Sequence, residues 1–345
     1  MARLYNIYHP ADLRAKLQAE PFERKTLSFY RYVKIADPQT FRDDLYAAWE
    51  TLGILGRVYI AHEGINAQIN IPQPNWDEFI AQINSVPQLQ NMYFNEAVHH
   101  GKSFIKLTIK VKEKIVADGL NDKTFNPADT GNHLTAEEWN AAMEDPDTIV
   151  VDMRNHYESR IGHFENAVTP DADTFREELP MVEETLKGKE DKKVLLYCTG
   201  GIRCEKASAY FKYKGFKDVN QLKGGIITYA KDIKQKGLPN KFKGKNFVFD
   251  ERLAEPISED VITYCDLCGK QSDRQLNCAN EICHLLFIQC EDCADKMQNT
   301  CSKECKDFIQ KPIKERRKLR KMKRCRDGME NYKNRLRPKI KNINM

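Results

Sequence analysis

Eight of the eleven cysteines in this chain lie between residues 265 and 305, where they form four close pairs. Two thiolates a few residues apart can chelate one metal ion, so four pairs match two tetrahedral four-cysteine sites. A segment this short and polar cannot fold by hydrophobic burial alone, and bound metal would supply the missing stability. The pattern predicts two structural zinc ions, with iron–sulfur ligation as the competing interpretation. The predicted ligands are Cys265, Cys268, Cys278, Cys283, Cys290, Cys293, Cys301 and Cys305.

The spacing leaves open how the four pairs combine, because sequential and interleaved pairing fit it equally well. His284 either replaces one cysteine as a ligand or belongs to an apolar strand over 284–289 beside the site. No cysteine precedes residue 198, and a secreted disulfide scaffold would spread its cysteines through a short chain. The distribution therefore favours intracellular thiol and metal chemistry.

The first third of the chain has the pattern of a small α+β domain. Alternating apolar residues predict strands, and longer amphipathic periods predict helices. The order β-α-β-β-α-β-β indicates a ferredoxin-like split βαβ fold with one extra strand. The predicted strands are 27–35, 57–61, 65–71, 91–100 and 103–111, and the predicted helices are 38–53 and 75–86.

The sequence HEGIN, residues 62–66, joins the second and third of these strands. It is either a tight connection in which Gly64 adopts an unusual backbone angle, or a functional surface loop carrying His62 and Glu63. Both interpretations remain open from the sequence.

Strands and helices alternate between about 134 and 236, which predicts an α/β domain with a parallel sheet. Thr135 and Glu138 have the spacing of a capping box that opens a helix. The predicted strands are 148–153, 192–198 and 219–224, with a helix over 205–213.

Cys198 ends the apolar strand 192–198, at the edge of the sheet where active groups of parallel sheets gather. The next residues, Thr199, Gly200, Gly201 and Ile202, form a loop whose amides can converge on one anion. The start of the following helix and Arg203 add positive charge, so the loop predicts a reactive thiolate or persulfide. Cys204 is either a resolving thiol for an oxidised Cys198 or a packed residue at the helix start.

The segment VDMRNHYESRIGHFENAV, residues 151–168, together with CTGGIR and LKGGI, resembles the rhodanese domain. The resemblance rests on Asp152, Arg154, Glu158, Gly162, His163 and Ala167. Rhodaneses have six residues from the catalytic cysteine to the arginine, as here from Cys198 to Arg203, whereas the related phosphatases have a longer loop. Phosphatase activity is therefore disfavoured. We expect Asp152, Arg154 and His163 to support the site rather than to act as catalysts.

Charge is unevenly distributed along the chain. Residues 311–345 carry fifteen Lys and Arg against three acidic residues, a local charge of +12, and the formal total of +5 leaves −7 for the rest. A basic tail on a mildly acidic body suggests a polyanionic partner, and RNA is the sharpest candidate; a solvated tail is the plainer alternative. We expect the tail to be a mobile arm or to become helical on contact. The candidate RNA-binding residues are Arg316, Arg317, Lys318, Arg320, Lys321, Lys323 and Arg324.

No apolar run approaches the ~20 residues of a membrane span, and no signal peptide is evident, so we expect a cytoplasmic protein. Taken together, HEGINAQI (62–69), YCTGGIRCEKASAY (197–210), GKNFVFDER (244–252) and CHLLFIQC (283–290) resemble the tRNA uridine(34) hydroxylase family. The resemblance runs from about residue 27 to 305.

The resemblance implies an oxidoreductase of the monooxygenase type that converts the wobble uridine of tRNA to 5-hydroxyuridine with molecular oxygen as co-substrate. It places the family's persulfide-type catalytic cysteine on Cys198, with Arg203 in the same loop, and the anticodon arm of tRNA as partner. No organic cofactor is evident from the sequence. The alternatives are a persulfide sulfurtransferase, which could act in tRNA thiolation, and a non-enzymatic RNA-binding redox sensor.

The expected organisation is an α/β multidomain chain. It comprises a ferredoxin-like α+β domain over 1–115, a linker over 116–133, a rhodanese domain over 134–240, a zinc-binding cysteine-rich module over 241–310 and a flexible basic tail over 311–345.

Overall fold

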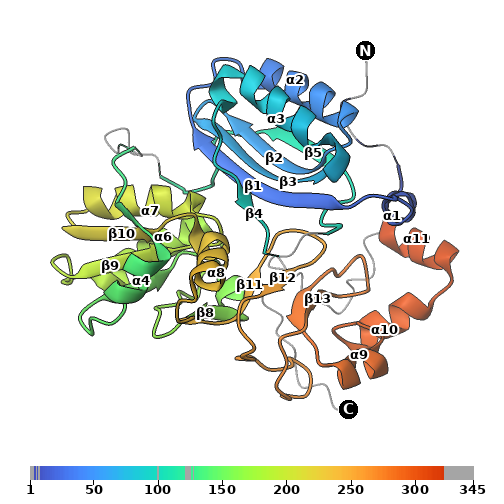
Figure 1. Cartoon of the computed structure of the whole chain (residues 1–345). Coiled ribbons are helices and arrows are strands. Elements are labelled where there is room, and N and C mark those ends of the chain that lie inside the picture. Colours follow the sequence, from blue (N-terminus) through green and yellow to red (C-terminus); the bar gives the residue numbers. More distant parts are fainter. Residues whose placement is uncertain are drawn as a thin grey trace. The chain divides into compact units, whose positions relative to one another are not determined.

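The computed structural model describes residues 4, 6, 8–98, 101–120, 126 and 128–321 (Figure 1). Lys323 and Arg324, from the predicted RNA-binding set, lie outside these residues, as do the side chains of Arg320 and Lys321. Throughout the part of the chain that is described, no helix has the length and apolar character needed to cross a membrane.

The chain divides into two compact units. The first comprises Met1–Asn155, Asn166–Lys241 and Val248–Glu255, and the second comprises His156–Glu165, Phe242–Phe247 and Pro256–Met345. The predicted N-terminal α+β segment and most of the predicted α/β segment lie in the first unit. The short segment 156–165, expected inside the rhodanese domain, groups instead with the cysteine-rich part of the chain.

The N-terminal part of the first unit is a five-stranded sheet in the order β4-β1-β3-β2-β5. β1 pairs antiparallel with β3 and β4, β2 pairs antiparallel with β3, and β5 runs parallel to β2 as the extra strand. This order confirms the ferredoxin-like prediction. The elements are α1 (Pro10–Gln18), β1 (Arg24–Tyr32), α2 (Pro38–Thr51), β2 (Leu55–Ala61), β3 (Gly64–Pro72), α3 (Trp76–Ser85), β4 (Asn95–Glu96) and β5 (Leu107–Val111), with short 3₁₀ turns at Gln73–Asn75 and Pro87–Leu89.

The strand predicted over 91–100 is reduced to the two residues of β4. Asn91 has a φ of 54°, which is incompatible with a strand. The guanidinium of Arg31 also donates to the carbonyl oxygens of Gln90 and Asn91, at 2.7 and 3.0 Å. These carbonyls are therefore not available for a sheet ladder.

Apolar residues on one face of this sheet pack against α2 and α3 (Figure 1). Leu27 and Phe29 of β1 are buried there, and the Phe29 ring meets Trp49 edge-on with centroids 6.3 Å apart. Ser28, Tyr30 and Tyr32 occupy the alternate positions of β1 and point to the opposite face, as strand alternation requires.

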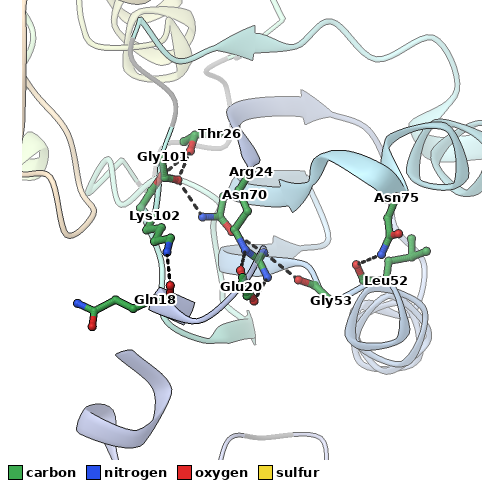
Figure 2. Close-up of polar contacts among 11 residues, drawn as sticks. Gln18, Glu20, Arg24, Thr26, Leu52, Gly53, Asn70, Asn75, Gly101 and Lys102 are labelled. Atoms are coloured by element: carbon green, nitrogen blue, oxygen red, sulfur yellow. Dashed lines mark hydrogen bonds and ion pairs between the residues drawn. The ribbon is translucent and has the colours of Figure 1, made fainter. Parts of the chain in front are cut away.

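A buried arginine secures the start of β1 (Figure 2). Arg24 donates through Nε and Nη2 to the Glu20 carboxylate at 2.7 and 2.8 Å. Its Nη1 donates to the Gly53 carbonyl and to Asn70 Oδ1, both at 3.0 Å. The guanidinium thus joins three segments of the domain and has its charge balanced by a paired carboxylate, which suits a structural role.

The second part of the first unit is a parallel sheet in the order β6-β10-β9-β7. Alternate residues of β9 face opposite sides. Val194 and Leu196 pack with α6 and α7, whereas the Tyr197 ring meets Trp139 of α4 at 6.0 Å. The elements are β6 (Asn132–Leu134), α4 (Ala136–Ala142), β7 (Ile149–Asp152), α6 (Phe175–Leu186), β9 (Lys193–Tyr197), α7 (Ile202–Tyr213), β10 (Asp218–Leu222) and α8 (Gly225–Lys236).

The starts of helices α4 and α7 were both predicted from the sequence. The capping box is confirmed, because Thr135 and Glu138 exchange side chain-to-backbone hydrogen bonds at the start of α4. The helix expected to begin at about residue 205 begins at Ile202. It starts earlier because Gly201, with a φ of 99°, turns the chain directly into the helix.

The second unit consists of short elements, and its packed residues include seven of the eight clustered cysteines, Cys268 being exposed. β8 pairs antiparallel with β11, and β13 pairs antiparallel with β14, which is the core of the predicted strand 284–289. The basic tail begins with helix α11. The elements are α5 (His156–Ser159), β8 (Gly162–Phe164), β11 (Phe242–Phe247), β13 (Gln275–Asn277), β14 (Leu286–Ile288), α9 (Glu291–Met297), α10 (Lys303–Gln310) and α11 (Ile313–Lys321), with β12 (Ala254–Pro256) spanning the boundary between the units.

Candidate active site and metal centres

Cys198 follows directly after β9, and the residues up to Gly201 form the loop that leads into α7. Its side chain is fully buried. The Gly201 N–H donates to Cys198 Sγ at 3.1 Å. Gly201 can present this amide because its φ of 99° lies in the left-handed region. The loop therefore directs one backbone donor, the Gly201 amide, at the sulfur.

Electrostatics favour the thiolate form of Cys198. Burial raises its pKa, but the hydrogen bond with the Cys204 thiol, the charge of Arg203 and the amides of Cys204 and Arg203 outweigh burial and lower the pKa to about 6. Arg203 is itself held in place, since its Nη2 donates to Thr199 Oγ1 at 3.3 Å. A pKa of about 6 favours the thiolate form of this sulfur at neutral pH.

Cys204 lies in the first turn of α7 and is also fully buried. Burial, followed by its hydrogen bond to Cys198 and the charge there, raises the pKa of the Cys204 thiol well above its usual value. The opposite directions of the two pKa shifts favour a thiolate at Cys198 and a thiol at Cys204.

The glycine pair of the LKGGI segment holds the loop from the other side. Ile226 N–H donates to the Cys198 carbonyl at 3.0 Å, and Ile227 N–H donates to the Thr199 carbonyl at 3.2 Å. Gly225 has a φ of 67°, and a Cβ atom there would lie 2.5 Å from the Cys198 carbonyl oxygen. Only glycine permits this close approach of α8 to the loop.

Asp152 and Arg154 form a buried ion pair beside β9. Arg154 Nη2 lies 2.6 Å from Asp152 Oδ2, and both side chains are fully buried. The Tyr197 hydroxyl donates to the same carboxylate oxygen at 2.7 Å, and the guanidinium lies over the Tyr197 ring. Tyr197 immediately precedes Cys198, so this network suits the supporting role expected of the two residues.

His163, the third expected supporting residue, belongs to β8 in the second unit. Its Nδ1 lies 3.0 Å from the Ser159 carbonyl oxygen, which fixes the ring within that unit.

The face of the N-terminal sheet opposite α2 and α3 supplies side chains that contact the Cys198 loop and the start of α7. The sequence did not indicate these side chains. Tyr30 OH donates to Glu205 Oε1 at 2.8 Å, and Asn95 Nδ2 donates to the Gly200 carbonyl at 3.1 Å. Tyr32 OH lies 3.5 Å from the Ile202 carbonyl oxygen. The alternation of β1 places Tyr30 and Tyr32 on one face, but no sequence signal indicates what that face contacts.

Glu205 is the centre of this contact. His133 Nε2 lies 3.0 Å from Glu205 Oε1, the atom that also accepts from Tyr30. Burial raises the pKa of Glu205, but hydrogen bonds from His133 and Tyr30 outweigh it and lower the pKa below its usual value. The pKa of Tyr30 is raised far above its usual value by burial and by Glu205, so its hydroxyl remains a donor.

The HEGIN segment forms the tight connection between β2 and β3, with Gly64 at a φ of 145°. A Cβ at Gly64 would lie 2.0 Å from the Arg31 carbonyl oxygen, which explains the glycine. Glu63 reaches Lys206 of α7 at 2.7 Å, and Lys206 also pairs with Asp118 at 3.0 Å. Lys206 is almost fully buried, so HEGIN contributes an ion pair to the helix that follows the Cys198 loop.

The eight clustered cysteines form two four-sulfur groups. One group contains Cys265, Cys268, Cys290 and Cys293, and the other contains Cys278, Cys283, Cys301 and Cys305. The predicted ligand sets are confirmed as groups able to hold metal, and the pairing is interleaved. His284 belongs to neither group; it is exposed, has a φ of 49° and precedes β14.

The spacing of the sulfurs fits a tetrahedral ion. Within each group all four sulfurs lie within 4.8 Å of one another. The Cys268–Cys290 and Cys283–Cys301 sulfur distances are both 3.6 Å, and Cys301–Cys305 is 3.8 Å. Zinc–sulfur bonds of about 2.3 Å place tetrahedral sulfurs roughly 3.8 Å apart, so four thiolates in each group can enclose one ion.

Of the candidate RNA-binding residues, Arg316, Arg317 and Lys318 lie on α11, with Arg317 and Lys318 exposed. The described part of the basic tail extends from residue 311 to 321.

Three family models match successive parts of the chain. The UPF0176 acylphosphatase-like domain matches residues 24–115, the rhodanese-like domain matches 135–232, and a rhodanese C-terminal model matches 243–306. Their order is that of the ferredoxin-like domain, the parallel-sheet domain with Cys198, and the cysteine-rich segment.

Curated relatives extend over nearly the whole chain. A Leptospira interrogans protein named tRNA uridine(34) hydroxylase is 54% identical over 341 residues, which cover 99% of this chain and 93% of that protein. Proteins of the same name from Pectobacterium carotovorum and Photorhabdus laumondii are 53% and 51% identical over 322 residues, covering 93% of this chain and 91% and 92% of their own lengths. This agreement confirms the resemblance inferred from the sequence motifs. The chain belongs to the tRNA uridine(34) hydroxylase family.

Proposed function

We propose that this chain hydroxylates uridine 34 of tRNA to 5-hydroxyuridine, with molecular oxygen as co-substrate and Cys198 as the nucleophile. The observation that carries the activity is identity above 50% to tRNA uridine(34) hydroxylases along nearly the whole chain. The assignment of Cys198 is supported by a buried sulfur that accepts from the Gly201 amide and has a pKa of about 6.

The chemistry follows from the electronic structure of the base. C5 of uracil is a poor carbon nucleophile, but addition of a thiolate to C6 places negative charge on C5 and on the 4-oxygen. The Cys198 thiolate can make this addition at neutral pH because its pKa is low. Arg203 and the loop amides would stabilise the anionic sulfur before attack, and the charge at C5 then directs oxygen to that carbon.

Residues of both α/β domains of the first unit would surround the base. Tyr30 and Tyr32 present aromatic rings beside the loop, with centroids 6.3 Å apart, and aromatic rings are common partners for unstacked bases. We assign the anticodon arm as the part of tRNA that approaches the loop, and the cytoplasm as the compartment where it does so. Arg316, Arg317 and Lys318 of α11, with the rest of the basic tail, would bind RNA phosphates.

We further propose zinc as the ion in both cysteine groups. Four thiolates at tetrahedral spacing suit zinc, and a complete thiolate shell leaves no open coordination position. The ions would therefore stabilise the second unit rather than take part in hydroxylation.

The test is nucleoside mass spectrometry of tRNA from cells that lack this gene, complemented by the wild type, Cys198→Ser or Cys325→Ser. The last variant is a matched control, because it removes a thiol from the tail rather than from the loop. We expect 5-hydroxyuridine derivatives with the wild type and Cys325→Ser only. Retention of these nucleosides with Cys198→Ser would exclude the sulfur-based mechanism. Loss of a thiolated nucleoside instead would identify a sulfurtransferase.

A further inference from the structure

Cys204 is a buried thiol that forms and breaks no bond in the proposed addition of Cys198 to uridine. It lies two residues after Ile202, in the first turn of α7, and its side chain is completely shielded from solvent. It packs in the same apolar cluster as Cys198, with side chains of β9, α6 and α7 around both sulfurs.

The Cys198 and Cys204 side chains are both fully buried and interact with each other. The Cys204 thiol is hydrogen-bonded to Cys198, whose sulfur also accepts from the Gly201 N–H at 3.1 Å. The donors on Cys198 favour its ionised form, and burial keeps Cys204 protonated. A thiolate beside a protonated thiol is the reduced form of a dithiol pair, and the two sulfurs can close a disulfide once one of them has been oxidised.

The proposed hydroxylation needs a two-electron reductant, and a pair of thiols can be that reductant. Insertion of one oxygen atom from O₂ into the C5–H bond leaves the second oxygen atom to become water, and this step takes up two electrons and two protons. Two thiols that form one disulfide release two electrons and two protons. The reactive loop therefore holds a reductant of matching stoichiometry in contact with its nucleophile.

We propose that Cys204 is a second catalytic residue, and that the Cys198–Cys204 pair supplies the two electrons of hydroxylation and leaves each turnover as a disulfide. This inference rests on the proposed hydroxylation at Cys198 and adds the source of its electrons. A cellular dithiol then reduces the disulfide for the next turnover.

Cys198 sulfur bonds to C6 of uridine, and O₂ bonds to the negatively charged C5, giving a C5 hydroperoxide after protonation. The Cys204 thiol attacks the outer peroxide oxygen; the O–O bond breaks, C5 keeps a hydroxyl group, and Cys204 becomes a sulfenic acid. Loss of the C5 proton breaks the C6–sulfur bond and releases 5-hydroxyuridine. Cys198 then attacks the Cys204 sulfenic acid, which forms the disulfide and releases water.

The positions of Lys and Arg in the sequence make a Cys198–Cys204 disulfide easy to detect. Trypsin cleaves after Lys193, Arg203 and Lys206, so Cys198 and Cys204 fall in two different peptides, 194–203 and 204–206. These peptides remain joined only if a disulfide links the two cysteines. The full-length protein, reduced and then freed of reductant without oxygen, is mixed with excess tRNA lacking the modification and with dissolved O₂.

We expect about one 5-hydroxyuridine per chain from this single turnover, together with the joined peptides in equal amount. Omission of either tRNA or O₂ should leave the peptides separate. Product formed while both thiols remain free would overturn the inference.

Cys204→Ser separates the two roles of the side chain. Its hydroxyl can still donate to Cys198, so the pH dependence of Cys198 ionisation should be nearly retained, but no disulfide can form. We expect the single turnover to fall by more than about tenfold, whereas a purely structural role would leave it intact. Cys204→Ala removes the hydrogen bond as well and should also raise the pKa of Cys198.

The outcomes distinguish this inference from the proposed function. If the wild type makes no 5-hydroxyuridine even with abundant dithiol, the hydroxylation itself is wrong. If the wild type is active and Cys204→Ser gives a full single turnover, only the role of Cys204 is wrong.

Discussion

At the scale of single residues, the ionisation of Cys198 depends on a few donors that outweigh complete burial. An isolated buried thiol stays neutral, because a low-dielectric interior penalises the charged form. Here the Cys204 thiol, the Arg203 guanidinium and two backbone amides stabilise the anion. The reactivity of the sulfur is therefore a property of the loop rather than of the cysteine alone.

The pH dependence of activity follows from this ionisation. The thiolate is the nucleophile, so kcat/KM should rise with pH, reach half its maximum at a pKa of about 6 and level off above neutrality. Arg203→Gln removes a stabilising charge and should move the midpoint to higher pH, whereas Arg203→Lys keeps the charge and should move it less. A pH–rate profile measures both. An unchanged midpoint in Arg203→Gln would show that Arg203 does not set this pKa.

Tyr30→Phe tests the contact between the N-terminal sheet and the loop. The substitution removes the hydrogen bond to Glu205, which lies on the first turn of α7. Hydrogen bonds to charged groups are worth about 1.5–3 kcal/mol, so we expect kcat/KM to fall by about tenfold or more. Tyr59→Phe, on β2 of the same sheet, is the matched control and should retain activity. Equal kinetics for the two variants would contradict a role for the Tyr30 hydroxyl.

At the scale of elements, β1 shows how one strand contributes to two structures. Leu27 and Phe29 fill the core of the ferredoxin-like domain, whereas Tyr30 and Tyr32 contact the first turn of α7 beside the Cys198 loop. Strand alternation requires such a division, because successive side chains point to opposite faces. The elements of the second unit are too short for a comparable core, and its cysteine groups take that place.

The interleaved pairing predicts the metal content of two double variants. Cys265→Ser with Cys290→Ser damages one group only, so one of two zinc ions should remain. Cys265→Ser with Cys278→Ser damages both groups and should lose both ions. Sequential pairing would reverse these results, which elemental analysis of the purified variants can measure.

Metal removal should also unfold this part of the chain, because structural zinc sites contribute about 10–16 kcal/mol to folding. Limited proteolysis with and without a strong chelator would then show new cleavage between 256 and 310, and added zinc should restore protection. Resistance of the metal-free protein would contradict a structural role for the ions.

At the scale of the whole molecule, charge separates along the sequence. The last 35 residues carry +12, whereas the remainder carries −7. Phosphate neutralisation by such a segment supplies affinity that depends little on sequence and strongly on salt. The tail would thus provide general attraction for RNA, and the Cys198 loop would provide the chemistry.

Truncation after Gln310 tests this division. We expect tRNA affinity to fall by at least about tenfold near physiological salt, and the slope of log Kd against log salt to become shallower, because fewer counterions are released. A variant with every tail Arg changed to Lys keeps the charge and is the control. An unchanged salt slope on truncation would show that the tail does not contact the phosphates.

The sequence by itself determined the features that depend on neighbouring residues. The capping box at Thr135 and Glu138, the glycine loop after Cys198 and the four cysteine pairs each occupy a few consecutive positions. Local backbone geometry and ligand spacing leave few alternatives at that range, so the pattern alone was enough. The alternation of β1 likewise fixed which of its residues share a face.

Only the tertiary structure decided which distant residues meet. Tyr30 and Glu205 are 175 positions apart, and Glu63 and Lys206 are 143 apart. Nothing in either short segment specifies its partner, because these contacts depend on how the sheet face docks on α7. The interleaved cysteine groups arose in the same way, since both possible pairings satisfy the spacing and only the fold of the second unit selects one. Local sequence thus placed the reactive sulfur, and long-range packing placed the groups around it.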